Sequence, residues 1–499
     1  METRSSHRWW ILVVLCLSSL VLVVDGMALT VAVPQMTRDI GATAQDTQWI
    51  LDSYILVFAG LLLTSGSLGD RFGRRKVMII GLLLFGAASL AAVFVTSPGE
   101  MIAVRVAMGV GGALIMPSTL SILIVVFDEE ERRKAVAAWT SVAMLGLVGS
   151  PVLGGVLIAR FSWHAIFFIN IPVVVLAILA GLVLMPESKG PWRRPDLPGA
   201  ALSAVGMVAL VWWIIGIPRH GAVGGTAVIP LAVAVVALGS FVYWENVTTE
   251  PMVPLVLFKQ RNFSGGSLSL ALVEVANGGL LLVFTQYLQF VLGYSPVKAG
   301  LAFVPLAVGA LVGNAAGVKL GATTGPRYLV LGGMLVMAAS FGLLTTVSAG
   351  TGFAVPATGL GLLGLGAGIA MPAAVAALMS AIPPEKAGVG SALNDTIQQA
   401  GSALGIAILG SLLAGGFTRH MPAGAPAQAR QSITGALAAA HGDTALVHAA
   451  REAYTASMSA TFTVSAIAIL AAALLATLVI RNPKSDPAAT PADEPELVA

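Results

Sequence analysis

Long apolar stretches separated by short polar segments recur along the whole 499-residue chain. A helix of about 20 apolar residues is long enough to cross the ~30 Å hydrocarbon core of a membrane, and a helix satisfies its own backbone hydrogen bonds in lipid. The pattern therefore predicts an all-α integral membrane protein. The fourteen predicted spans are 9–33, 49–68, 77–96, 100–127, 135–160, 163–185, 198–217, 226–243, 263–292, 296–318, 328–348, 352–381, 388–416 and 456–480.

Composition excludes a soluble protein. Hydrophobic residues make up 57% of the chain and charged residues only 10%, whereas soluble domains carry about 25% charged residues. The first apolar stretch follows Arg4 and Arg8 and has the general form of a secretory signal. Because no small-residue cleavage site follows it promptly, we expect an uncleaved first helix.

The distribution of basic residues predicts the orientation. Lys and Arg in short loops accumulate on the cytoplasmic side of a membrane. With both termini inside, 19 of the 27 Lys and Arg residues lie on the cytoplasmic side, seven lie outside, and Arg105 alone lies within a span. We therefore expect a multi-pass protein of the plasma (inner) membrane with both termini cytoplasmic. No basic patch with interleaved aromatic residues indicates a nucleic-acid partner.

An internal repeat divides the chain into two halves. Residues 108–120 match residues 363–375 at an offset of 255, which places Gly109 on Gly364 and Gly111 on Gly366. Many transporters are built from two related halves in this way. The predicted domains are an N-terminal six-helix bundle at 1–190, a two-helix insert at 191–250, a C-terminal six-helix bundle at 251–483 and a cytoplasmic tail at 484–499.

Ionisable residues inside the predicted spans are the first functional candidates, because a charge at membrane depth is costly and normally faces a partner or a cavity. Asp25 and Arg105 lie about 12 Å and about 8 Å from the outer ends of their helices, so they can pair. Glu274 lies near the midplane without a cationic partner in its own helix. Desolvation disfavours its charged form, which suits a group that takes up and releases protons.

Two further acids have competing interpretations. Asp395 is either a proton-coupling residue or part of an interhelical hydrogen-bond network with nearby polar side chains. Asp52 lies about one turn into its predicted span. It is either a helix-start acid stabilised by the helix dipole or a residue of the transport pathway. The polar neighbours of Asp395 are Asn394, Thr396, Gln398 and Gln399.

Polar and aromatic side chains near the span ends are weaker candidates. Tyr54, Trp139, Gln286 and Tyr287 are able to line an amphipathic substrate cavity together with Asp52, but Trp and Tyr at these depths also serve as interface anchors. The segment 417–455 contains His441, Asp443 and His448 without a further ligand at recognisable spacing. We therefore expect no metal site and no cofactor.

The loop between the second and third predicted spans, "SGSLGDRFGRRKV", combines glycines that reverse the chain with a basic cluster and one aspartate that can pair with an arginine or a helix N-terminus. It resembles the loop signature of the major facilitator superfamily, in which such a loop has a gating role. A generic positive-inside loop explains only the charges. The matching residues are Gly66, Asp70, Arg71, Gly73 and Arg74.

A second motif in "GLVGSPVLGG" is similar to the antiporter motif of this superfamily, which is associated with export coupled to proton entry. As physical chemistry alone, its small residues indicate close helix packing. The segment 105–113 resembles the motif of the superfamily that carries a buried arginine, although Met108 replaces a usual glutamine. The segments 24–34, 286–300 and 390–411 resemble the fourteen-helix drug:proton antiporters of the QacA/EmrB type. The antiporter-motif residues are Gly146, Ser150, Pro151, Gly154 and Gly155.

The resemblance implies a proton-coupled antiporter that exports hydrophobic or amphipathic small molecules and functions as a monomer. An enzyme is not expected, because the sequence has no phosphate-binding loop, nucleophile elbow or zinc motif. The alternative is a passive facilitator or metabolite exporter of the same fold without proton coupling. A non-transport receptor or a membrane enzyme is a more distant alternative.

Overall fold

The computed structural model describes residues 7–189, 196–222, 224, 227–382, 387–440 and 443–480, and these residues contain helices and no β-strands. The predicted tail at 484–499 lies outside them. The helices are α1 (Arg8–Asp39), α2 (Ala44–Phe72), α3 (Arg74–Ala92), α4 (Pro98–Val126), α5 (Glu129–Arg160), α6 (Ala165–Phe168), α7 (Asn170–Leu184), α8 (Leu197–His220), α9 (Val228–Val247), η2 (Leu255–Lys259), α10 (Arg261–Gln286), η3 (Tyr287–Val291), α11 (Pro296–Leu301), α12 (Val304–Thr324), α13 (Pro326–Leu344), α14 (Ala354–Met379), α15 (Ala387–His420), α16 (Ile433–Ala439) and α17 (Thr444–Val479).

Local sequence fixes where several helices begin. The Thr43 hydroxyl accepts from the Asp46 backbone N–H, and the Asp46 carboxylate accepts from the Thr43 backbone N–H, so the two form a capping box at the start of α2. Ser97 and Glu100 form the same arrangement at the start of α4. Such caps satisfy backbone donors that the first helical turn leaves free. They place the start of α2 at Ala44, five residues before the predicted span.

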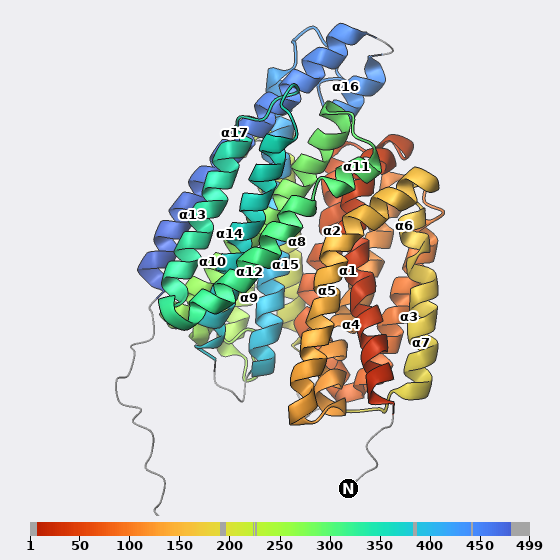
Figure 1. The fold of residues 1–499 in the computed structure, drawn as a ribbon, viewed down its shortest axis with the longest axis vertical. Helices are drawn as coiled ribbons and strands as arrows, with labels where there is room; N and C mark the ends of the chain where they lie inside the picture. The colour runs from red at the N-terminus through yellow and green to blue at the C-terminus, as the bar shows by residue number, and fades with distance from the viewer. Residues whose placement is uncertain are drawn as a thin grey trace, which may run out of the picture.

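Two separate hydrophobic cores organise the described residues. One is built mainly from α1–α7 and the other from residues between Leu257 and Ile480. Figure 1 shows the red-to-yellow helices of the first core beside the green-to-blue helices of the second. α16 lies at one end of the molecule beside the start of α17 (Figure 1), and this end is called the α16 end below.

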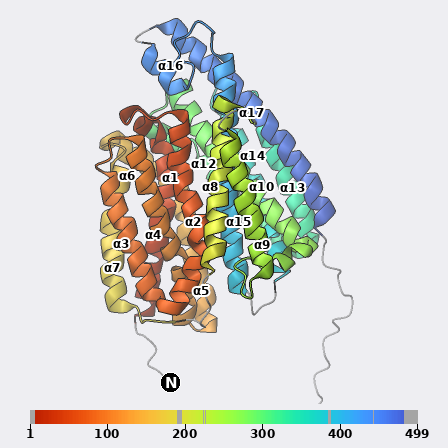
Figure 2. The ribbon, with the colours of Figure 1, turned by 180° about the vertical axis from the view of Figure 1, so that it is seen from behind.

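α8 bridges the two cores. A third hydrophobic cluster joins Leu56 of α2, Val211 and Ile215 of α8, and Ala403 and Ala407 of α15. The view from behind shows α8 between α2 and α15 (Figure 2). α9 packs mainly against α8, and its exposed valines are suited to contact with lipid.

The helix packing confirms the internal repeat. Gly109 of α4 lies against α2, where an added Cβ would come 2.7 Å from the Tyr54 carbonyl oxygen, and Gly364 of α14 lies against α12 at Leu306. Gly111 and Gly366 likewise lie against α3 and α13. Because the glycines at the offset of 255 bring equivalent helix pairs together, the two halves share one packing scheme.

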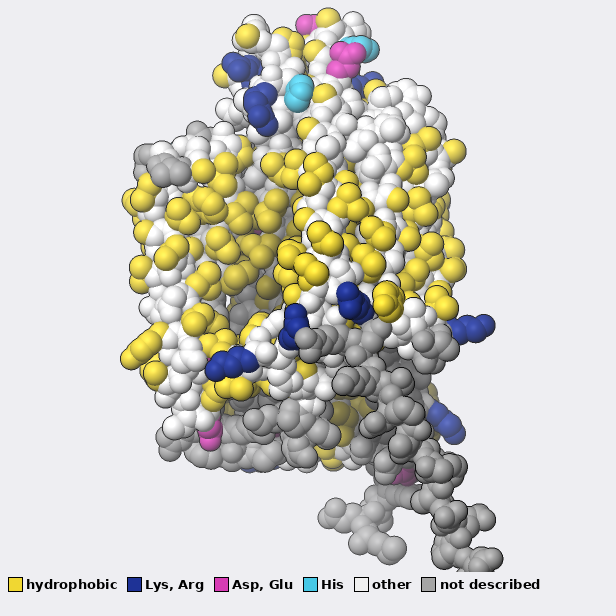
Figure 3. Space-filling view, turned by 90° about the vertical axis from the view of Figure 1, so that its left-hand side faces the viewer, with side chains coloured by type: hydrophobic (Ala, Val, Ile, Leu, Met, Phe, Trp, Pro, Cys, Tyr) yellow, Lys and Arg dark blue, Asp and Glu magenta, His cyan; other side chains and the backbone are white. Residues whose placement is uncertain are grey.

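Twelve helices of the described residues are long and apolar enough to cross a membrane, and up to thirteen if the bent segments of α2 count as one span. The count of fourteen therefore remains a prediction. Hydrophobic side chains cover the middle of the face in Figure 3, and charged side chains gather towards its two ends. The start of α1 and the end of α17 both lie away from the α16 end (Figure 1).

Candidate functional site

Asp25 and Arg105 form a buried ion pair between α1 and α4. Arg105 Nη1 donates to Asp25 Oδ2 at 2.6 Å, and the two residues are 0% and 1% exposed. The predicted pairing is therefore present in the structure. A buried ion pair is held together strongly only if the remaining polar atoms are also satisfied, so the surroundings of this pair determine its behaviour.

Neutral polar residues from α7 and α3 complete the surroundings of Asp25. Asn170 Nδ2 donates to Asp25 Oδ1 at 3.1 Å and to Ser89 Oγ at 3.3 Å. Asn170 and Ser89 are both fully buried. The sequence reasoning missed them because a single neutral polar residue in an apolar stretch is a weaker signal than a charge. The available signal was an amide within the apolar stretch 163–185.

α2 holds the guanidinium of Arg105 from a third side. Arg105 Nε donates to the Ile50 carbonyl oxygen at 3.3 Å, and the guanidinium carbon lies 4.2 Å from the centre of the Tyr54 ring. This second contact is a cation–π interaction. Met108, which replaces the family's glutamine, contacts Arg105 through its sulfur at 3.9 Å. Tyr54 thus contacts the ion pair directly, from a position that was predicted to line a substrate cavity.

Asp52 is buried where α2 meets the C-terminal half. It lies in the third turn of α2, and the first-turn acid is Asp46, so the interpretation of Asp52 as a helix-start acid is wrong. One turn earlier on the same face, Gln48 donates to the carbonyl oxygens of Ile406 and Ala407 in α15, both at 3.4 Å. Neither carboxylate oxygen of Asp52 has a hydrogen-bond partner among the described residues.

Glu274 lies at the packing surface between α10 and α15. A Cβ on Gly401 of α15 would come 3.0 Å from Glu274 Cβ. The Glu274 side chain is half-buried, and within the described parts of the chain no hydrogen bond or ion pair to it is found. Its isolation from cations matches the expectation from the sequence.

Asp395 makes a local contact within α15. Its Oδ1 accepts from Asn394 Nδ2 at 3.0 Å. Asn394 Oδ1 and Thr396 Oγ1 are buried without partners in the described part of the structure. The predicted interhelical network around Asp395 is therefore not seen among these residues.

The remaining cavity candidates differ in their surroundings. Trp139 Nε1 of α5 donates to Ser19 Oγ of α1 at 2.7 Å, which ties these two helices together. Gln286, the last residue of α10, is half-buried. Tyr287 is fully buried, and its hydroxyl donates to the Ser348 carbonyl oxygen at 2.8 Å. Tyr287 therefore belongs to the C-terminal core in this structure.

The loop signature is tied to the N-terminal half. Asp70 Oδ1 accepts from Arg74 Nε at 3.0 Å and from Arg74 Nη2 at 2.8 Å. Arg74 Nη1 also donates to the Ser121 carbonyl oxygen near the end of α4, at 3.2 Å. The expected pairing of Asp70 with an arginine is confirmed. Arg71 stacks its guanidinium over the ring of Phe72, and Gly66 faces α4.

Glu187, which the sequence reasoning missed, lies in the segment after α7 and contacts the loop signature. Its Oε1 accepts from the Arg75 backbone N–H at 3.1 Å. Gly73 has a φ of +115°, and a Cβ there would lie 2.6 Å from the Glu187 carboxylate. The backbone conformation favours a glycine at this position, and a larger residue would also have to displace the Glu187 carboxylate.

The antiporter motif packs on two different helices. The Ser150 hydroxyl donates to the Gly146 carbonyl oxygen within α5. Gly154 lies against Ala28 of α1, whereas Gly155 lies against α11, where an added Cβ would be 2.6 Å from the Pro296 carbonyl oxygen. In return, Gly300 of α11 lies against the Pro151 backbone. The motif thus joins the two halves.

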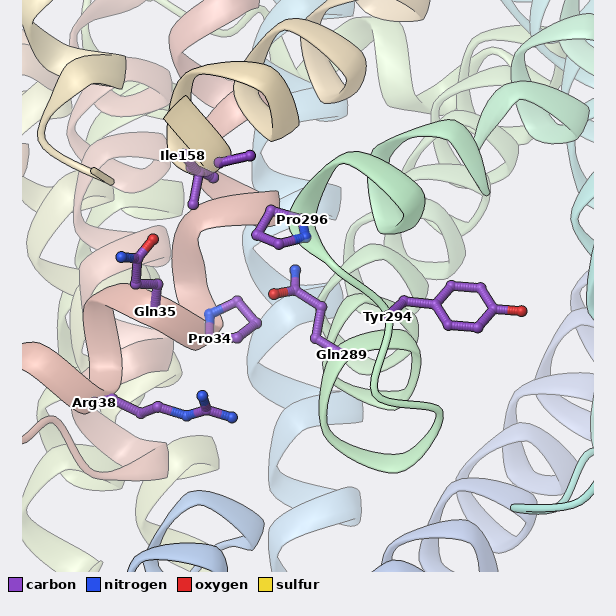
Figure 4. Close-up of a pocket in the computed structure, with 8 residues that line it drawn as sticks. Pro34, Gln35, Arg38, Ile158, Gln289, Tyr294 and Pro296 are labelled. Carbon is purple, nitrogen blue, oxygen red and sulfur yellow. The ribbon is translucent and has the colours of Figure 1, made fainter. Parts of the chain in front are cut away.

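A cavity of about 350 Å³ opens at this junction. It is lined by Gln35 and Arg38 of α1, Ile158 of α5, and Gln289 and Pro296 of the C-terminal half (Figure 4). Gln289 Nε2 donates to the Val31 carbonyl oxygen at 2.9 Å. The Arg38 guanidinium lies 4.8 Å from the centre of the Phe290 ring. These contacts hold the two halves together at the α16 end.

The comparisons with known proteins agree with this architecture. The family model described as Major Facilitator Superfamily matches residues 15–406. The multidrug efflux pump LfrA of Mycolicibacterium smegmatis is 33% identical, with 96% of this chain and 98% of that protein covered. The tetracenomycin C resistance and export protein of Streptomyces glaucescens is 34% identical, with 81% and 76% covered. The puromycin resistance protein pur8 of Streptomyces alboniger is 34% identical, with 83% and 84% covered.

A solved structure shows the same fold. It is the inward-facing, occupied form of a bacterial homologue of the human lysosomal transporter Spinster, with a TM-score of 0.69, 17% identity, and 96% of this chain and 98% of that one covered.

A two-core helical bundle with charges buried between its helices defines a non-enzymatic, multi-pass membrane transporter of small molecules. The chain belongs to the major facilitator superfamily. Its relatives are named as multidrug efflux and antibiotic resistance proteins, which supports drug export and is consistent with the drug:proton antiporters that the sequence resembles.

Proposed function

We propose that the protein is a proton-coupled antiporter that exports hydrophobic or amphipathic small molecules across the plasma membrane. The buried Asp25–Arg105 ion pair is the observation that carries this proposal. The proposal includes fourteen membrane-spanning helices, cytoplasmic termini and a monomeric protein. Its domains are two bundles at 1–190 and 251–483 with an insert at 191–250.

Proton uptake by Asp25 provides a way to couple the gradient to movement. An ionised Asp25 attracts Arg105 and holds α1 against α4. A protonated Asp25 loses this attraction, so the two helices can adopt a second arrangement. A ligand or proton that binds one of two conformations more tightly shifts the equilibrium towards it. Asp25 thus supplies the two-state element that coupling requires.

Glu274 and Asp395 are proposed as additional sites for protons or cationic substrates. Both are acids on helices of the C-terminal half without a basic partner among the described residues. Separate acids in the two halves allow a proton and a substrate to occupy the transporter at different places. Such an arrangement favours exchange of one for the other over passive diffusion.

The conformation of the structure fits one state of an alternating-access cycle. The proposed topology places the α16 end outside the cell. The contacts of Gly155, Gly300 and Gln289 then close the outer side. The Asp70–Arg74 pair lies at the opposite, cytoplasmic end, where it is suited to stabilise one conformation of the cycle.

Energetics limit what such exchange achieves. One elementary charge moving across 100 mV provides ~2.3 kcal/mol, and a tenfold concentration gradient requires ~1.4 kcal/mol. One proton therefore supports a gradient of roughly fiftyfold for a neutral substrate. A monovalent cation exchanged one-for-one moves no net charge, so only the pH gradient then drives export.

Proteoliposomes with separately imposed gradients test the proposal. Ethidium, a lipophilic cation, and puromycin serve as probes, with liposomes that lack protein as the control. The proposal predicts transport of at least one probe against its gradient when a pH gradient or a membrane potential is imposed. Movement of both probes only down their own gradients, whatever the pH gradient and potential, would indicate a passive facilitator instead.

A further inference from the structure

Asn170 is placed to respond to the protonation state of Asp25. Its Nδ2 donates both to Asp25 Oδ1 at 3.1 Å and to Ser89 Oγ at 3.3 Å. Its own Oδ1 is buried and has no hydrogen-bond partner among the described residues. A buried amide oxygen without a partner is destabilising, so this arrangement calls for a physical explanation.

The two forms of Asp25 need opposite partners. An ionised carboxylate only accepts hydrogen bonds, whereas a protonated carboxyl group also donates one. Because Arg105 already binds Oδ2, a proton is expected on Oδ1, the oxygen that faces Asn170. The N–H groups of Asn170 would then point at the new O–H group. A half-turn of the amide replaces them with Oδ1, which accepts.

Ser89 is suited to both orientations of the amide. Its hydroxyl accepts from Asn170 Nδ2 in the structure, and a hydroxyl can equally donate to the amide oxygen. We propose that Asn170 is a positioning residue for Asp25, and that its amide turns over when Asp25 takes up a proton, with Ser89 as its partner in both orientations. This inference rests on the proposed coupling role of Asp25. Asn170 itself neither gains nor loses a proton.

Few other ionisable groups surround this site. The helices α3, α5 and α7 carry none between residues 77–92, 135–159 and 170–184. Of the other helices packed against α1 or against the pair, α2 contributes Asp52 and Tyr54, α4 contributes Arg105, α10 contributes Glu274 and α11 contributes Lys298, and α2 and α4 carry further charges only near their ends. Few charges therefore lie near Asp25 besides Arg105, so the loss of one amide is measurable.

Infrared difference spectroscopy of the purified full-length protein across a pH titration tests the inference. The carboxylic acid band that disappears in Asp25→Asn belongs to Asp25. Asn170→Leu removes a donor from the carboxylate, which raises the midpoint of this band, and an acceptor from the acid, which lowers it. Because the hydrogen bond to the charged form is the stronger of the two, we expect a net move of the midpoint to the alkaline side by less than about one pH unit. The band should also move to higher frequency, because the acid loses its acceptor.

Two further variants keep the result interpretable. Ser89→Ala removes a partner that serves both orientations of the amide, so it should leave the midpoint nearly unchanged. Ser340→Ala, which removes a buried hydroxyl bonded to the Gly359 carbonyl oxygen in the C-terminal half, should also leave it unchanged. An unchanged midpoint and frequency in a folded Asn170→Leu protein would overturn the inference. If Asn170→Leu does not fold, the same outcome in Asn170→Ala overturns it. Absence of any titrating Asp25 band in the parent would instead contradict the proposed coupling role.

Discussion

Gly155 of α5 lies so close to Pro296 of α11 that a Cβ on the glycine would be 2.6 Å from the proline carbonyl oxygen. These residues belong to different halves of the transporter, so their separation limits how tightly the α16 end closes. We expect Gly155→Leu to prevent this closure and to favour a conformation that is open at the α16 end, because a side chain cannot occupy the space.

Spin labels at Arg160 and Lys298 measure this effect as a distance. Both positions are exposed, and the single cysteine, Cys16, can first be replaced by serine. The distance should lengthen in Gly155→Leu. Gly149→Leu is a matched control, because an added Cβ there meets no atom within 4 Å. An unchanged distance in Gly155→Leu would show that the α5–α11 contact does not govern closure.

Asp70→Asn should impair switching between conformations more than stability. The Asp70–Arg74 pair is partly exposed and is an i,i+4 contact, so its loss should lower the free energy of unfolding by under about 1 kcal/mol. Transport should fall several-fold in proteoliposomes. Arg8→Gln breaks a comparable pair with Glu131 and should leave transport largely intact. Normal transport by Asp70→Asn would show that the Asp70–Arg74 pair has no role in switching between conformations.

Glu274→Gln should change the pH profile of transport or the range of substrates. The substitution preserves the shape of the side chain but removes a titratable group that has no basic partner among the described residues. Initial rates for ethidium and puromycin across a pH series provide the measurement, with the exposed Glu452→Gln as a control. If both the profile and the two rates match the parent, Glu274 is only a tolerated polar residue.

The Asp25–Arg105 pair should show strong coupling in a double-mutant cycle. Asp25→Asn or Arg105→Ala alone leaves one charged or polar group unpaired in the interior, which is expected to cost about 3–5 kcal/mol. The double variant should lose less than the sum of the two. Unfolding in detergent measures these losses. The partly exposed Arg8–Glu131 pair is the control, with coupling below about 1 kcal/mol. Additive losses at Asp25 and Arg105 would contradict the pairing.

The sequence predicted features that depend on local pattern or on depth in the membrane. The pairing of Asp25 with Arg105 followed from counting 1.5 Å per residue along two helices. The repeated glycines at 109 and 364 indicated equivalent packing in the two halves, which the structure confirms. The error at Asp52 arose because the predicted span began too late. The capping box of Thr43 and Asp46 was the missed signal.

Several other contacts between distant residues had no signal in the sequence strong enough to predict them. Asn170 is 145 residues from Asp25, and a neutral amide does not interrupt an apolar stretch as a charge does. The contact between Gly155 and Pro296 joins separate halves, so no local pattern encodes it. Glu187 likewise reaches Arg75 from a segment 112 residues away. Each of these contacts needed the packing of whole helices to be known.

Substrate-driven proton movement in Asp25→Asn tests the central claim most directly. Proteoliposomes that contain the protein and a trapped pH dye receive a gradient of whichever probe, ethidium or puromycin, the parent transports, and the internal pH is followed. The parent and Ser340→Ala should move protons against this probe, whereas Asp25→Asn should bind the probe without moving protons. An Asp25→Asn protein that exchanges protons for the probe at the parent rate, or accumulates the probe against its gradient when a pH gradient is imposed, would contradict the account.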